Sequence, residues 1–166
     1  MTDPSSPRLR QPAHRVSSRA ILWWTAQALG GWLALLVPAT VGVLFVEDEP
    51  GWIATGLEVL AVLALAHILV MPSWRFRVHR WEATADAVYT QSGWLNQEWR
   101  VAPMSRIQTV DTERGPLQQL LGLSTVTVTT ASAAGPLHVA GLDAGVANRL
   151  VEQLTATTQA TPGDAT

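Results

Sequence analysis

Residues 101–130, VAPMSRIQTVDTERGPLQQLLGLSTVTVTT, decide the fold because their local signals describe one compact unit of strand, short helix and strand. Pro116 suits the first position of a helix, since its φ is fixed and it has no amide hydrogen to leave unpaired. Gly122 supplies the left-handed residue that ends such a helix. Between them, leucines at helical spacing share one face: Leu117, Leu120 and Leu121.

A strand is expected on each side of this short helix. Ile107 and Val110 lie in a β-prone run that ends before the Arg-Gly-Pro turn. Residues 124–130 alternate valine with threonine, and Val126 and Val128 fall on one face. That alternation is typical of a half-buried strand.

This unit resembles the bacterial pleckstrin-homology-like (PH-like) proteins of the YdbS type, whose domain is also called the membrane-flanked domain. The resemblance is carried by PMSRIQTV at 103–110, GPL at 115–117, GLS at 122–124 and VTVTT at 126–130. It extends from about Arg75 to Leu154, with two hydrophobic helices upstream. Proteins of this type are often encoded beside a larger membrane protein with several copies of the same domain. The resemblance therefore implies a hetero-complex with such a partner.

Composition excludes several classes of function. The chain has 166 residues, a net charge of −2 and 11 basic residues, all of them arginine, so no basic field is available for nucleic acid. It has no cysteine, which excludes disulfides, thiolate metal sites and cysteine nucleophiles. The hydrophobic fraction of 48% averages an apolar first half with a polar second half, which indicates a membrane protein.

Two apolar stretches are long enough to cross a membrane. Residues 20–46 carry no charge, and about 27 helical residues reach roughly 40 Å, more than a ~30 Å hydrocarbon core requires. Residues 52–71 match that thickness closely, and Pro72-Ser73 is expected to end this second helix. We expect residues 1–19 to form a disordered tail.

The arginines predict the orientation of the hairpin. Four precede the first span, none lies in the acidic loop, and Arg75, Arg77 and Arg80 follow the second span. The positive-inside rule therefore places both termini in the cytoplasm and the protein in the plasma membrane. Tryptophans are expected to mark the two interfaces, at Trp23, Trp24 and Trp74 on the inner side and Trp52 on the outer side.

The rest of the chain predicts a cytoplasmic PH-like domain at residues 74–156. Strands are expected at 75–79, at 87–91 and at a segment in which Leu95, Gln97, Trp99 and Val101 share one face. After the central unit and a strand with Leu137 and Val139, Asp143 caps a final helix. Its apolar stripe consists of Ala147, Leu150, Val151 and Leu154. The predicted fold is a membrane α+β protein, a transmembrane hairpin followed by an antiparallel β-roll with an inserted helix and a C-terminal helix. Residues 157–166 are expected to be disordered.

Polar and small residues within the spans raise separate hypotheses. Glu58 could be a proton or cation site in a transporter-associated subunit, or bind a partner helix, or reach the headgroups from its place near the outer end. His67 is nine residues on, on the opposite side of the helix, so the two cannot form a dyad within one helix. We expect His67 to be an interfacial or packing residue near the cytoplasmic end. Ala26, Gly30 and Ala34 have the spacing of close helix contacts, and we expect them to face the second span rather than another protein.

Three arginines at the inner surface could bind anionic lipid. Arg75, Arg77 and Arg80 would each gain about 1 kcal/mol there, although they could equally serve only to set topology. A phosphoinositide site of the eukaryotic PH kind needs a basic cluster at the loop between the first two strands. We take that loop to be residues 82–86, EATAD, whose acidity argues against such a site.

The central unit carries the candidate protein-binding residues. They alternate in polar character along one strand and could form a binding face or a strand edge for β-augmentation, with a solvated salt-bridge ladder as the alternative. These residues are Ser105, Arg106, Gln108, Asp111, Arg114 and Leu117. Ser105 lacks a base and an oxyanion turn, and four scattered histidines make no metal-ligand set, so no enzyme activity, metal or cofactor is expected. The function predicted is a non-catalytic, membrane-anchored interaction protein, with a homo-oligomer as another assembly to consider.

Overall fold

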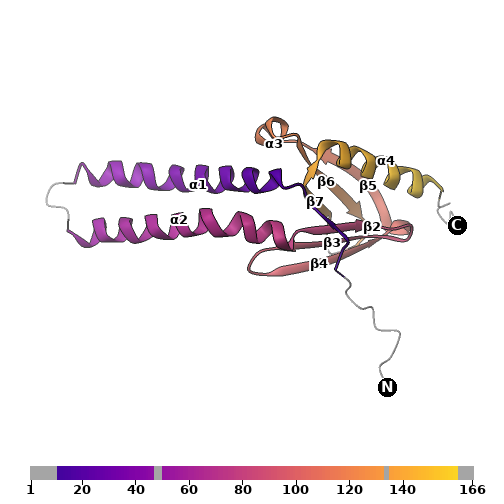
Figure 1. The fold of residues 1–166 in the computed structure, drawn as a ribbon, viewed down its shortest axis with the longest axis horizontal. Helices are drawn as coiled ribbons and strands as arrows, with labels where there is room; N and C mark the ends of the chain where they lie inside the picture. Colours follow the sequence, from indigo (N-terminus) through magenta and orange to yellow (C-terminus); the bar gives the residue numbers. More distant parts are fainter. Residues whose placement is uncertain (1–10, 47–49, 133–134, 161–166) are drawn as a thin grey trace, which may run out of the picture.

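The computed structural model describes residues 11–46, 50–132 and 135–160. A long helical hairpin extends from one end of a small β-domain, and helix α4 covers that domain (Figure 1). The elements are, in order, β1 His14–Arg15, α1 Arg19–Val43, α2 Trp52–Val78, β2 Arg80–Ala83, β3 Ala87–Gly93, β4 Gln97–Pro103, the 3-10 turn η1 Met104–Arg106, β5 Ile107–Glu113, α3 Pro116–Leu120, β6 Leu123–Thr130, β7 Leu137–Asp143 and α4 Ala144–Ala160.

The strands described form two antiparallel sheets, ordered β1-β2-β3-β4 and β5-β6-β7. The helical hairpin is inserted between β1 and β2, the first two strands of the larger sheet. Helix α4 packs on β5, β6, β7 and η1 through the predicted stripe, in which Ala147, Leu150 and Leu154 are at most 2% exposed. The predicted fold class is therefore confirmed.

The central unit forms as its local signals predict. Pro116 begins α3, and Gly122 follows it with a φ of +66°. Val126 and Val128 are fully buried in β6. Asp143 caps α4, because its Oδ1 accepts a hydrogen bond from the Gly145 amide at 3.0 Å.

The segment before the hairpin is structured, so the prediction of a disordered tail through residue 19 is wrong for residues 11–18. His14 pairs with Trp81 and Arg15 with Arg80, which makes β1 the outer strand of the larger sheet. Val16 is 6% exposed, and the Ser17 amide donates to the Gly141 carbonyl of β7 at 2.9 Å. The segment thus connects both sheets. Helix α4 continues to Ala160, so the predicted disordered C-terminal tail is wrong for residues 157–160. Residues 1–10 and 161–166 of the two predicted tails lie outside the described residues.

Helix α2 continues to Val78, so the predicted helix end at residues 72–73 and the strand at 75–79 are wrong. Pro72 is buried within the helix, and the His79 amide still bonds to the Arg75 carbonyl at 2.9 Å. Val78 and His79 are both buried against the domain. Packing of this last turn outweighs the period-two alternation that suggested a strand.

The hairpin packs through a different set of α1 residues than expected. The buried residues of α1 are Ala20, Trp24 and Ala28, whereas Gly30 has open space around it and Ala34 is exposed. The prediction that the stripe at residues 26, 30 and 34 faces the second span is therefore wrong. The small residues that the packing does use are Ala20 and Ala28, on either side of Trp24 along the helix.

The turn between β3 and β4 differs by a few residues from expectation. The strand predicted at 87–91 continues to Gly93, and β4 begins at Gln97, so Leu95 lies in the turn and not on the strand. Gly93 has a φ of +110°, and a Cβ there would meet the Asn96 carbonyl oxygen at 1.8 Å. This position therefore requires glycine.

Candidate functional site

An aromatic and cationic cluster joins the base of the hairpin to the domain. Trp24 of α1 is completely buried, and the Arg75 guanidinium carbon lies 4.6 Å from the centre of its ring. The His79 ring lies 5.0 Å from the Trp24 ring on another side. Trp24 is therefore a core residue and not a member of the predicted inner belt, whereas Trp74 is 47% and Trp52 is 73% exposed.

His79 is held neutral in this cluster. Its Nδ1 lies 3.1 Å from the Arg75 carbonyl oxygen, which can only accept, so the ring hydrogen resides on Nδ1. Burial, and secondarily the Arg75 charge, lower the pKa of His79 from 6.5 to about 4, against the opposing effect of that hydrogen bond. The junction therefore loses stability when His79 is forced to accept a proton.

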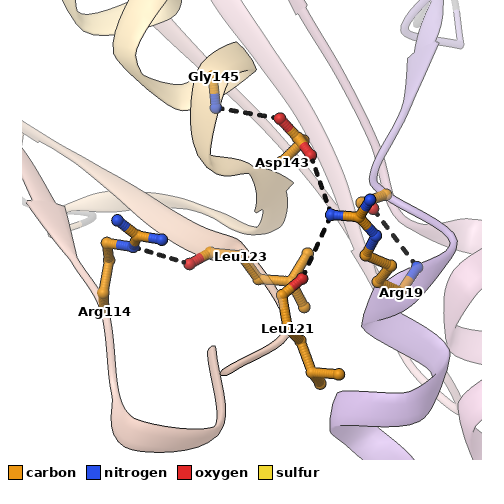
Figure 2. Close-up of polar contacts among 7 residues, drawn as sticks. Arg19, Arg114, Leu121, Leu123, Asp143 and Gly145 are labelled. Carbon is orange, nitrogen blue, oxygen red and sulfur yellow. Dashed lines mark hydrogen bonds and ion pairs between the residues drawn. The ribbon is translucent and has the colours of Figure 1, made fainter. Parts of the chain in front are cut away.

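Arg19, the first residue of α1, contacts the end of α3 and the junction of β7 with α4 (Figure 2). Its Nη1 lies 3.5 Å from both the Leu121 carbonyl oxygen and the Asp143 carboxylate. Asp143 in turn caps α4 at Gly145. Both members of the ion pair are about half exposed, so the pair orients the helix rather than adding much stability.

The β3–β4 turn contacts the hairpin on the α2 side. The Trp74 indole donates to the Trp94 carbonyl at 2.9 Å, and the Trp94 ring lies 5.5 Å from that of His67. His67 also accepts a hydrogen bond from the Trp32 indole at 3.0 Å. His67 is thus a packing residue between the helices, whereas Glu58 is exposed on α2, and the two form no dyad.

The three arginines predicted to bind lipid do not form one patch. Arg75 covers the Trp24 ring, Arg77 is exposed, and Arg80 is half-buried in β2 beside β1. Glu82 and Ala83 of the expected acidic loop lie in β2, and residues 84–86 connect β2 with β3. These are not the first two strands of the sheet, so the expected phosphoinositide loop was assigned to the wrong connection. The hairpin itself occupies the connection between the first two strands.

Four of the candidate protein-binding residues lie in β5 and in the turn η1 directly before it. Ser105 and Arg106 are exposed in η1, and Gln108 and Asp111 are exposed in β5. Within the described ranges, β5 pairs with β6 alone, so its other edge has no strand partner. The remaining two candidates lie beyond this edge. Arg114 donates from Nε to the Leu123 carbonyl at 3.2 Å, and Leu117 is 41% exposed on α3.

One polar cavity lies between β4 and the β6–β7 connection. Its volume is about 270 Å³, and Glu98, Arg100, Thr130 and Leu137 are among its lining residues. The Arg100 guanidinium donates to the carbonyls of Gly135 and Pro136, at 3.0 Å for Gly135. This cation therefore secures a turn. In the part of the chain that the structure describes, no three His, Asp or Glu side chains gather as a metal site would require.

Sequence reasoning missed the residues that attach the hairpin to the domain. Pro12 and Val16 are buried at a spacing that fits one strand face, and this was the available signal for the β1 segment. The roles of Trp24, His79 and Trp94 depend on contacts across 55 residues or more or on a turn, and no local pattern predicts them.

These features define a class of membrane-anchored protein, in which a two-helix hairpin carries an antiparallel β-roll closed by a C-terminal helix. Both described helices of the hairpin are long and apolar enough to span a membrane. A family model described as the bacterial PH domain matches residues 31–158, and the chain therefore belongs to the bacterial PH domain family.

One similar sequence is named as a transmembrane protein. The chain is similar to the transmembrane protein YdbS of Bacillus subtilis (strain 168), with 28% identity over 158 residues, which cover 93% of this chain and 98% of the relative. No solved structure matches the chain. The family resemblance inferred from residues 101–130 is confirmed, and the chain is a membrane protein.

Proposed function

We propose that this chain is a non-catalytic, membrane-anchored interaction module whose β5 edge binds a second membrane protein. The observation that carries the proposal is the unpaired edge of β5 within the described residues, on a domain fixed to its hairpin at several points. An exposed strand edge offers a row of backbone donors and acceptors to a partner strand. A fixed orientation lowers the entropy lost on binding, because the edge is already positioned relative to the membrane.

The domain is proposed to face the cytoplasm. Arg19, Arg75, Arg77 and Arg80 all lie at the domain end of the hairpin, whereas the loop at its other end reads EDEPG. Positive charge beside spans favours the cytoplasmic side. A cysteine introduced at the loop should therefore react with an impermeant maleimide outside intact cells, and one at Glu152 should not.

The partner is proposed to be a larger membrane protein with repeated PH-like domains. This follows the resemblance to YdbS-type proteins, and such a domain would offer β-strands of matching length. The exposed side chains of the edge mix both charges and amides, which gives selectivity between strands. A second copy of this chain is the alternative partner for the β5 edge.

A charge reversal tests the proposal. The tagged protein is purified from its own membranes in mild detergent, and co-purifying proteins are identified by mass spectrometry. Arg106→Glu should remove a stoichiometric membrane partner, whereas Arg149→Glu, a matched reversal on the exposed side of α4, should retain it. Retention of the partner by Arg106→Glu, with normal membrane abundance of both variants, would contradict the assignment of the edge.

A further inference from the structure

Two turns of the domain project back alongside the hairpin. Figure 1 shows the β3–β4 turn beside α2 and helix α3 on the opposite side, beside α1, and both extend toward the hairpin tip to a similar level. Contacts fix both positions. Trp94 of the first turn touches His67 and Trp74, and Leu121 at the end of α3 accepts a hydrogen bond from Arg19.

The same two turns carry the most exposed apolar side chains of the domain. Leu95 in the β3–β4 turn is 76% exposed, and Leu120 at the end of α3 is 83% exposed; these are the largest values for bulky hydrophobic residues among the described residues after the hairpin. Leu117 on α3 adds another 41% exposed leucine. Apolar exposure concentrated at two sites on one end of a domain indicates a contact surface.

The level of these turns relative to the membrane follows from the length of α2. The helix begins at Trp52, which is exposed and suits an interface, and at 1.5 Å per residue a ~30 Å hydrocarbon layer ends about 20 residues later, near residue 72. His67 then lies roughly 7 Å inside that layer. The Trp94 ring, 5.5 Å from His67, reaches the boundary between acyl chains and headgroups.

The chemistry of the β3–β4 turn fits this boundary. Backbone groups exposed to hydrocarbon are costly, and the Trp94 carbonyl is already paired with the Trp74 indole. Indole rings favour the headgroup level of a membrane, and a leucine side chain that extends beyond them is stabilised by burial in the acyl layer. Arg77, exposed on the last turn of α2, lies close enough to the base of the hairpin to meet headgroup phosphates.

We propose that the PH-like domain sits directly on the lipid surface, with the β3–β4 turn at Trp94–Leu95 and the α3 turn at Leu117–Leu120 inserted into the interfacial layer on opposite sides of the hairpin. The occupant of both turns is lipid, because the hairpin that they flank is itself surrounded by lipid at that level. The two insertions prevent the domain from tilting about its hairpin and fix the height of the β5 edge above the membrane.

The absence of cysteine allows a direct test. Single cysteines replace Leu95, Leu120 and, as a control, Glu152, which is exposed on α4, the helix that leads away from the hairpin (Figure 1). Each variant of the full chain is spin-labelled and placed in lipid nanodiscs without any partner. Collisions with oxygen, which concentrates in lipid, are compared with collisions with a water-soluble nickel chelate.

Labels at 95 and 120 should both show an oxygen-to-nickel accessibility ratio several-fold above that of the label at 152. A ratio at either turn equal to that at 152 would overturn the proposal. A label at either turn that is protected from both reagents would indicate a protein occupant, such as a second copy, and would overturn it as well. A label at Val62, which is 67% exposed on α2, confirms that the hairpin of each preparation is inserted.

Discussion

The Arg75 guanidinium carbon lies 4.6 Å from the centre of the Trp24 ring, so the last turn of α2 and the first turns of α1 meet over one buried indole. His79 also contacts this indole, at 5.0 Å between ring centres. A cation placed over an indole with little water nearby is favourable by about 1–2 kcal/mol. This cluster, rather than a flexible linker, joins the membrane hairpin to the β-domain.

Replacement of Trp24 should weaken the whole junction. Trp24→Ala removes a fully buried indole from the core and uncovers Arg75, so we expect a loss of about 3–5 kcal/mol in the free energy of unfolding of the domain. Chemical denaturation in detergent micelles measures it. Trp52→Ala, at a 73% exposed position, is the control and should leave the domain transition unchanged. Equal losses in the free energy of unfolding for the two variants would contradict the role of Trp24 in the junction.

Stability should depend on pH through His79. Its pKa is about 4 in the folded protein and 6.5 when unfolded, so above pH 6.5 both states are neutral and the domain has its full stability. As pH falls from 6.5 to 4, the unfolded state binds the proton first, and up to about 3 kcal/mol of stability is lost. Denaturation at several pH values should show this loss, and His79→Gln should flatten it. His138→Gln, at an exposed position, should not.

Two glycines with similar backbone conformations should respond differently to alanine. Gly141 and Gly135 have φ values of +79° and +76°, but a Cβ at Gly141 would lie 2.8 Å from the Ala20 Cβ at the base of α1, whereas Gly135 faces open space. Gly135→Ala should therefore cost only about 1–2 kcal/mol for the left-handed backbone. Gly141→Ala should cost clearly more, because α1 must move. Equal melting temperatures for the two variants would show that α1 does not pack closely against β7 at Gly141.

Two substitutions at the cap of α4 distinguish the contribution of charge from the contribution of hydrogen bonding. Asp143→Ala removes the acceptor for the Gly145 amide and should cost about 1 kcal/mol, while Asp143→Asn keeps an acceptor and should cost less. The Arg19 pair is lost in both variants, but it is exposed and contributes little. Thermal unfolding of the two variants measures the difference. Equal losses for the two variants would make the ion pair, not the cap, the stabilising contact.

The central unit could be predicted from sequence because its signals are local. Pro116 and Gly122 fix the ends of α3 whatever surrounds them, and the alternation of Val126 and Val128 requires only that one face be covered. The β1 segment could not be predicted in this way, because a two-residue strand is stabilised only by its pairing with β2, 65 or more positions away. The predicted end of α2 was wrong because packing of its last turn on Trp24, and not the local sequence, determines where the helix ends.

The candidate site was predictable to the same extent. Gln108 and Asp111 lie in β5, and Ser105 and Arg106 lie in the turn η1 directly before it, since neighbours in sequence remain neighbours in the fold. Arg75 and Arg80 were grouped by sequence, yet one covers an indole and the other lies in the sheet. Leu95 was assigned to a strand face, and its place at the tip of a turn depends on the unusual backbone at Gly93.

Photo-crosslinking in native membranes tests the binding role of the β5 edge most directly. A photoreactive amino acid is placed at Gln108 in β5 or at Asn148 on α4, both exposed, and the products are separated by size and identified by mass spectrometry. We predict one discrete product with another membrane protein from position 108 and none from position 148. No product at 108, or the same product from both positions, would contradict the account.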